Sequence, residues 1–172
     1  MDAGSRRRAA MLALPAFALV VAACGSGSSG SQGGSGGSGP VTISTGSSSG
    51  TTYLTDGSGR AVYLWAAEQG QPLCSGACAG AWPPVTTTGK PGTSGKAVAS
   101  DVGTVKRDDG SRQVTYDGHP LYYYAQDGGP GSTSGEGSNG FGAKWWLLAP
   151  SGSAVTALKG GGSSGSGGGG GY

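Results

Sequence analysis

The sequence predicts a small all-β domain, because three observations agree between residues 40 and 159. Apolar and polar residues alternate with a period of two, and the helical period of 3.6 is absent from Thr51 onward. Turn dipeptides such as Asp56-Gly57 and Asp117-Gly118 interrupt these runs at short intervals. Of the 39 glycines, 17 lie in two runs at 25–39 and 160–171, which resemble flexible tethers. We therefore expect a small antiparallel domain flanked by a disordered Gly/Ser linker and a disordered Gly-rich tail.

Six strands are expected in this domain, each bounded by glycine or aspartate turns. They are Thr51–Thr55, Arg60–Trp65, Thr104–Lys106, Arg112–Tyr116, Pro120–Tyr124 and Lys144–Leu148. Before the first strand, residues 46–50 have the spacing of a hydrolase nucleophile elbow, but they lie in a Ser/Gly tract without the required strand-to-helix turn. Residues 135–140 spell a dinucleotide fingerprint, but a strand follows them, so we interpret them as a glycine loop.

The N-terminus has the pattern of an export signal. Arg6-Arg7-Arg8 precedes an uncharged apolar run from Ala9 to Ala23. The run ends in Val21-Ala22-Ala23-Cys24, which resembles the lipobox of bacterial lipoproteins, in which the cysteine thiol receives diacylglycerol. We expect a signal peptide at 1–23, acyl chains such as palmitate on Cys24, and a flexible tether at 24–39. Ser5-Arg6-Arg7 leaves the twin-arginine export route open beside the general secretory route.

The charge of the mature chain excludes one class of partner. Without the first 23 residues, eight basic and eight acidic side chains remain, so the chain is formally neutral. A protein that binds a phosphate backbone needs clustered Lys and Arg on one face. We therefore expect no nucleic-acid partner, and a membrane contact made through the lipid alone.

The cysteines predict a disulfide. If Cys24 carries lipid, Cys74 and Cys78 remain as an even pair in an oxidising compartment. Their short loop stabilises the fold by about 2 kcal/mol according to the chain-entropy model. Haem attachment is excluded, because the spacer has three residues and Ala79 follows the second cysteine where the haem motif has histidine. A redox pair, or a metal site that adds His119, remains open as an alternative.

Two stretches of the domain resemble each other. Tyr63-Leu-Trp65-Ala-Ala-Glu68 and Tyr122-Tyr-Tyr124-Ala-Gln-Asp127 share the order tyrosine, second aromatic residue and acid, and their tyrosines are 59 positions apart. Each stretch runs on to a tryptophan and a proline. An internal repeat explains this pattern economically, with a first repeat at about 51–85 and a second repeat at about 104–150.

These motifs resemble a known family. The shape Tyr-x-(Phe, Trp or Tyr)-x-x-(Asp or Glu) occurs with Cys74-x-Gly-x-Cys78-Ala-x-x-Trp82-Pro-Pro and with Arg107-Asp-Asp-Gly-x-x-Gln113-Val-Thr-Tyr. Together they are similar to the bacterial secreted-repeat lipoproteins of unknown function, over about Tyr53 to Pro150. The resemblance implies a protein outside the cytoplasm, anchored by lipid to the bacterial cell membrane, and it brings no ligand. Glu68 stands where that family more often has aspartate.

The motif has two interpretations. Alternation places both aromatic positions of each copy on one face of its strand. In the first interpretation the rings fill the core and the acid accepts backbone N–H groups of the following turn. In the second, the rings form a shallow ledge that stacks on a sugar or a similar apolar plane, and the acid accepts its hydroxyl protons. The candidate binding residues are then Tyr63, Trp65, Glu68, Tyr122, Tyr124 and Asp127.

No catalytic residue is expected. His119 lies in a tight turn, where a solvated side chain is the simplest role. Asp108 and Asp109 belong to a hairpin turn and, as neighbours, are expected to point apart. We therefore expect a non-enzymatic binding or interaction module of the cell envelope, without a resident cofactor or metal, whose partner is a cell-wall glycan or an envelope protein. The alternative is a redox or metal-handling protein that uses Cys74, Cys78 and His119.

Overall fold

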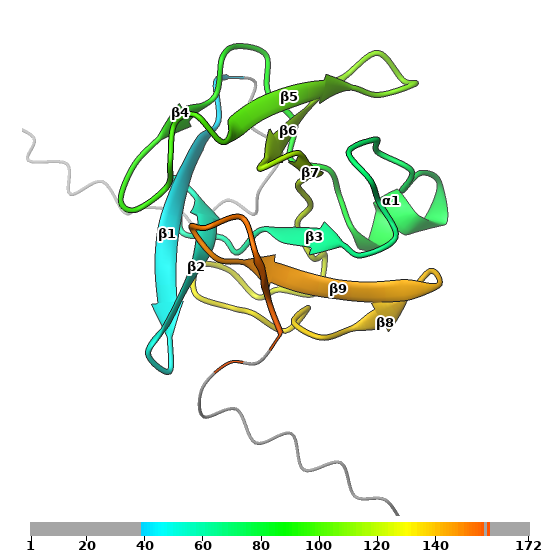
Figure 1. Ribbon diagram of the computed structural model, residues 1–172. Coiled ribbons are helices and arrows are strands. Elements are labelled where there is room, and N and C mark those ends of the chain that lie inside the picture. The colour runs from blue at the N-terminus through cyan, green and yellow to red at the C-terminus, as the bar shows by residue number, and fades with distance from the viewer. Residues whose placement is uncertain (1–38, 157, 159–172) are drawn as a thin grey trace, which may run out of the picture. The chain divides into compact units, whose positions relative to one another are not determined.

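The computed structural model describes residues 39–156 and 158. The predicted signal peptide at 1–23, the predicted lipidation site Cys24 and the predicted tail at 160–172 lie outside the described residues. The described chain forms three small sheets, mostly antiparallel (Figure 1), and so confirms the all-β prediction. No helix in this part of the chain is long and apolar enough to span a bilayer.

The first sheet contains β1 (Thr42–Ser48), β2 (Thr51–Asp56) and β4 (Gly92–Thr93), in the order β2-β1-β4. Strand β2 was predicted and strand β1 was not, because its serines and glycines were interpreted as a loop tract. The tract forms a strand because residues 43–48 pair with all of β2 and Ile43 is completely buried. The chain turns between the strands at 49–50, where both residues have positive φ angles of 49° and 76°.

The second sheet contains β5 (Val102–Lys106), β6 (Arg112–Tyr116) and β7 (His119–Pro120), in chain order. The predicted turn at 108–110 connects β5 and β6. Strand β7 is shorter than the predicted Pro120–Tyr124, because the chain leaves this sheet after Pro120 and pairs with other segments.

The third sheet lies at the centre of the domain. Figure 1 shows β3 between β9 and the β5-β6-β7 sheet. The strand order is β10-β9-β3. Strand β8 pairs with the first two residues of β9, Ala143 and Lys144. Strand β9 matches the predicted strand at Lys144–Leu148, whereas β3 covers only the last three residues of the predicted Arg60–Trp65. The four strands are β3 (Tyr63–Trp65), β8 (Asn139–Gly140), β9 (Ala143–Leu148) and β10 (Ala154–Val155).

A short helix, α1 (Ala77–Ala81), corrects the expectation that the domain contains no helix. Its five residues are too few to show a helical period in the sequence. The helix follows Gly76, which has a φ of 55°, and ends at Trp82, whose N–H donates to the carbonyl of Cys78 at 2.7 Å. Pro83 prevents the helix from continuing.

The core consists of two clusters that lie on opposite faces of β3. Tyr63 and Trp65 point into an aromatic cluster, which also holds the two cysteines. Val62 and Leu64 point into an aliphatic cluster. The period of two is therefore present as predicted, but both faces of this strand are buried. The main members are Tyr53, Tyr63, Trp65, Trp82, Tyr122 and Trp145 in the first cluster, and Ile43, Leu54, Val62, Leu64, Val85, Val114, Leu121 and Leu148 in the second.

Candidate functional site

The two sequence motifs meet at the centre of the domain. Tyr63 and Tyr122 form an antiparallel bridge in which each N–H donates to the other residue's carbonyl, at 2.8 and 2.9 Å. Beyond the bridge, each repeat makes an equivalent main-chain hydrogen bond to the other repeat. Ala66 donates to the carbonyl of Lys144 at 2.9 Å, and the equivalent Ala125 donates to the carbonyl of Ala81 at 3.0 Å. The two repeats are thus related by an approximate twofold axis through the bridge.

The side chains of the motifs are exchanged across this axis. The hydroxyl of Tyr63 donates to Asp127 Oδ2 at 2.9 Å, and the hydroxyl of Tyr122 donates to Glu68 Oε1 at 2.7 Å. Each tyrosine therefore binds the acid of the other repeat. The motif joins the two halves of the domain through one reciprocal pair of hydrogen bonds.

Each acid also holds the loop that follows it in its own repeat. Glu68 Oε1 accepts the N–H groups of Leu73 at 2.6 Å and Cys74 at 3.2 Å. Asp127 Oδ1 accepts the N–H of Ser134 at 2.8 Å and the hydroxyl of Ser132 at 3.1 Å. The first interpretation of the motif, in which the acid accepts N–H groups of the turn, describes both repeats.

Burial and the acids raise the pKa of both tyrosines well above the usual range. For Tyr63 the causes are desolvation, then the charge of Asp127 and the hydrogen bond to it. For Tyr122 they are desolvation, then the hydrogen bond to Glu68 and the charge of that carboxylate. Both phenols therefore stay protonated, as hydrogen-bond donors, wherever the domain is folded near neutral pH.

Four aromatic rings form a continuous column that alternates between the repeats. Trp65 stacks on Trp145 with centroids 5.3 Å apart, Trp145 stacks on Trp82 at 4.0 Å, and Trp82 stacks on Tyr124 at 4.3 Å. The motif tyrosines pack edge-on against the two central rings, Tyr63 on Trp82 and Tyr122 on Trp145. The column follows the same approximate twofold axis as the hydrogen bonds.

The burial of these residues corrects the idea of an exposed aromatic ledge. Tyr63 and Tyr122 are 0% exposed, Glu68 is 2% and Trp65 is 9%. These four side chains cannot present a binding face, because they are buried in the interior of the domain. Of the six candidates, only Tyr124 and Asp127 are partly exposed.

The predicted disulfide between Cys74 and Cys78 is present. The two cysteines are 1% and 7% exposed, so thiols in solution have little access to the bond. Both sulfurs are used in the disulfide, so they are not free as thiolate ligands, and His119 lies in β7 paired with Tyr116. Among the described residues, no group of three His, Cys, Asp or Glu side chains is placed to hold a metal. The structure therefore does not assemble the alternative metal set.

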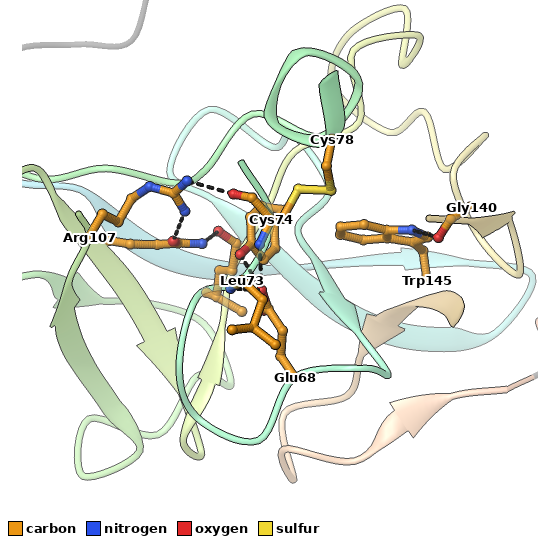
Figure 2. Close-up of a disulfide and its surroundings, with 10 residues drawn as sticks. Glu68, Leu73, Cys74, Cys78, Arg107, Gly140 and Trp145 are labelled. Atoms are coloured by element: carbon orange, nitrogen blue, oxygen red, sulfur yellow. Dashed lines mark hydrogen bonds between the residues drawn. A yellow bond between two sulfur atoms is a disulfide. The ribbon is translucent and has the colours of Figure 1, made fainter. Parts of the chain in front are cut away.

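The main chain of Cys74 is clamped from both sides, as Figure 2 shows. Its N–H donates to Glu68, and its carbonyl accepts from Arg107 Nη2 at 2.6 Å. Arg107 belongs to the second repeat, so its hydrogen bond connects the disulfide loop of the first repeat to the second repeat. On the far side of the disulfide in this view lies the indole of Trp145, which donates to the carbonyl of Gly140 at 3.1 Å.

Arg107 is a site residue that sequence reasoning missed. Beside two aspartates of a hairpin turn it looks like an exposed charge, yet its side chain is only 7% exposed. Its Nη1 donates to Gln113 Oε1 at 2.6 Å, and Gln113 Nε2 donates to the carbonyl of Leu121 at 2.8 Å. The available signal was its place, together with Gln113, in the pattern that carries the family resemblance.

A pocket of about 390 Å³ lies where the disulfide loop of the first repeat meets the β5–β6 turn of the second. Asp108 and Asp109 both border it. Leu73 stands at the pocket with 61% of its surface exposed. The pocket lining includes Leu73, Ser75, Ala79, Arg107, Asp108 and Asp109.

Comparison with known proteins identifies part of the chain. Residues 103–149 match the model of a lipoprotein family described as a secreted repeat of unknown function. The match begins in β5 and ends just after β9, so it covers nearly all of the second repeat, including Tyr122 and Asp127. Neither the curated proteins nor the solved structures gave a match. The match supports the resemblance to secreted-repeat lipoproteins that the motifs in the sequence indicated, over residues 103–149.

Proposed function

We propose that this chain is a lipid-anchored protein of the bacterial cell envelope that acts as a non-catalytic binding module. The secreted-repeat match at 103–149 and the lipobox-like sequence before Cys24 support the location. The pocket between the repeats is the single observation that carries the binding role. The aromatic motif serves a different purpose in this proposal, because it builds the two-repeat frame that holds the pocket walls.

Both walls of the pocket are held in place before any ligand arrives. On one side the disulfide closes the loop, and Glu68 and Arg107 hold the main chain of Cys74. On the other side Asp109 Oδ1 accepts the N–H of Ser111 at 2.8 Å and its hydroxyl at 2.6 Å, which fixes the turn. A preformed site loses little conformational entropy on binding. The rigidity thus favours recognition of a small ligand or a short segment.

The chemistry of the pocket favours binding over catalysis. Its walls combine the apolar side chains of Leu73 and Ala79 with the carboxylates of Asp108 and Asp109. Hydrogen bonds to Gln113 and Cys74 already engage the guanidinium of Arg107. A nucleophile paired with a general base is not part of this lining. Apolar contact with a few orienting polar groups is the usual composition of a ligand site.

Photo-crosslinking from the pocket tests the binding role. A photoreactive phenylalanine analogue replaces Leu73 in one strain and Val98 in another, since Val98 is also exposed, at 44%, and does not line the pocket. After irradiation of intact cells, we expect one defined adduct from position 73 and none from position 98, with the bound species identified by mass spectrometry. Equal labelling from both positions, or none from either, would contradict the proposal.

The lipid anchor has its own test. Cys24→Ser removes the thiol that would receive lipid, so we expect the chain to move from the membrane fraction to the soluble fraction and to lose labelling by radioactive palmitate. The double variant Cys74→Ser/Cys78→Ser is the matched control and should remain in the membrane fraction. A Cys24→Ser chain that stays with the membrane would show that another feature anchors the protein.

A further inference from the structure

We propose that the pocket between the repeats binds a carbohydrate, as a pyranose ring that places one hydroxyl between Arg107 and Asp109 and packs a C–H face on Leu73. This inference rests on the proposed binding function and names its ligand class. It begins from a polar atom that the fold leaves unsatisfied, and it then uses the two carboxylates and the apolar wall.

Arg107 has one donor without an acceptor. Its two terminal nitrogens donate to Gln113 and to the carbonyl of Cys74, but Nε has no hydrogen-bond partner. The side chain is 7% exposed, and its Nε lies 3.7 Å from Asp109 Oδ2, beyond hydrogen-bond distance. A buried N–H group without an acceptor is costly, and such groups are rare in folded proteins. A ligand atom in the pocket that accepts from Nε would remove this cost.

A hydroxyl group can form hydrogen bonds with both Arg107 Nε and Asp109 Oδ2. Its oxygen can accept from Arg107 Nε and its proton can go to Asp109 Oδ2, since an oxygen about 2.8 Å from each atom bridges such a separation. An ammonium group cannot accept from the N–H, and a fully deprotonated anion cannot donate to the carboxylate. Asp109 has a side chain 63% exposed, and Ser111 engages only its Oδ1, so Oδ2 remains as the acceptor that faces Arg107.

The remaining lining fits a ring with several hydroxyls. Asp108 offers a second, exposed carboxylate that can accept another hydroxyl proton, and Ser75 can donate or accept. Leu73 and Ala79 form an apolar wall on which the C–H face of a pyranose can pack. The volume of about 390 Å³ lies at the lower end for ligand pockets and accommodates one or two sugar rings.

Isothermal titration of the full-length chain in detergent tests the assignment, with N,N′-diacetylchitobiose and cellobiose as probes. We expect saturable binding of at least one disaccharide. Asp109→Asn should weaken it about tenfold, because the amide keeps the oxygen that binds Ser111 and replaces the acceptor facing Arg107 by a donor. Asp108→Ala should weaken it by a similar factor. Asp101→Asn, an acid outside the pocket, should leave it unchanged.

The possible results distinguish carbohydrate binding at the pocket from the more general binding function. Binding that Asp109→Asn and Asp108→Ala do not weaken would place the sugar elsewhere and overturn the assignment. A chain that binds neither sugar but gives a specific adduct from position 73 has another ligand class, and the binding function stands. Failure of both experiments would overturn both. Sedimentation with purified cell-wall sacculi, competed by the free disaccharide, distinguishes a wall glycan from a soluble sugar.

Discussion

The two repeats make the same contacts in different surroundings: in each, an acid binds the tyrosine of the other repeat and holds its own loop. In the first repeat the acid is Glu68, which is 2% exposed and uses one oxygen to accept from Leu73, Cys74 and Tyr122. In the second repeat the acid is Asp127, which is partly exposed and divides its partners between two oxygens. A disulfide closes the loop after Glu68, whereas the loop after Asp127 is rich in glycine and serine.

This difference shows what the motif requires. Each acid must hold its own loop and the tyrosine of the other repeat, and either Glu or Asp can do so. Burial and the disulfide are additions of the first repeat, where one pocket wall is built. The first repeat should therefore be the more sensitive half of the domain, and the following predictions test that asymmetry.

The largest effect is expected from Glu68→Ala. The change leaves the buried N–H of Cys74, the partly buried N–H of Leu73 and the buried hydroxyl of Tyr122 without an acceptor, so the free energy of unfolding should fall by at least about 3 kcal/mol. Asp127→Ala should cost only about 1–2 kcal/mol, because water can reach the released groups of Ser132 and Ser134, and only the hydroxyl of Tyr63 is left buried. Urea denaturation followed by circular dichroism measures both values. Equal losses would show that burial of the first acid does not distinguish the repeats.

Loss of the disulfide should have the next largest effect. In Cys74→Ala/Cys78→Ala the free energy of unfolding should fall by about 2 kcal/mol, because the unfolded chain regains the entropy of a short loop. The fold should persist, since Glu68 and Arg107 still hold the main chain at position 74. Denaturation under oxidising conditions gives the value, and denaturation of the unchanged protein with a reductant, which reaches the bond once the chain unfolds, should reproduce it. An unfolded double variant would mean that the disulfide is essential to the loop.

Gly135→Ala should test the packing of the second loop. An added Cβ would lie 2.9 Å from Trp82 and 3.0 Å from Tyr63, so the aromatic column must shift at a cost of about 1–2 kcal/mol. Gly128→Ala in the same loop is the control, because a Cβ there has no atom within 4 Å. It should be neutral or slightly stabilising. Thermal unfolding of the two variants makes the comparison, and similar melting temperatures would argue against close packing at Gly135.

The smallest expected effect is a dependence of the free energy of unfolding on pH. The folded pKa values of Tyr63 and Tyr122 are raised above the unfolded value of about 10, so their stabilisation is complete below pH 10 and is lost as the pH rises further. Each phenol should contribute about 1.4 kcal/mol per pH unit there. Tyr63→Phe and Tyr122→Phe should each reduce the slope measured by denaturation between pH 10 and 11. A slope that neither variant changes would contradict the buried tyrosine–acid bonds.

Local features of the fold were predictable from the sequence. Alternation and turn dipeptides indicated the all-β class and the hairpin of β5 and β6, and the cysteine count indicated the disulfide. Strand β1 was missed because serine and glycine carry little strand preference, and only pairing with β2 and burial of Ile43 reveal it. Helix α1 was missed because it is shorter than two helical periods.

The candidate site was less predictable, because it depends on long-range register. The sequence placed tyrosine and acid in each motif and indicated that the acid accepts turn N–H groups, but it could not show that Tyr63 binds Asp127 across 64 positions. Arg107 illustrates the same limit. Its burial follows from the approach of Cys74 from the other repeat, a contact that no local pattern records.

The central claim is that each motif tyrosine binds the acid of the other repeat. Double-mutant cycles measured by urea denaturation test it most directly, with Tyr→Phe, Glu→Gln and Asp→Asn as the single changes. The pairs Tyr63–Asp127 and Tyr122–Glu68 should show coupling of about 1–2 kcal/mol. The pairs within one repeat, Tyr63–Glu68 and Tyr122–Asp127, should couple by no more than about 0.5 kcal/mol. Strong coupling within each repeat and none between repeats would contradict the account.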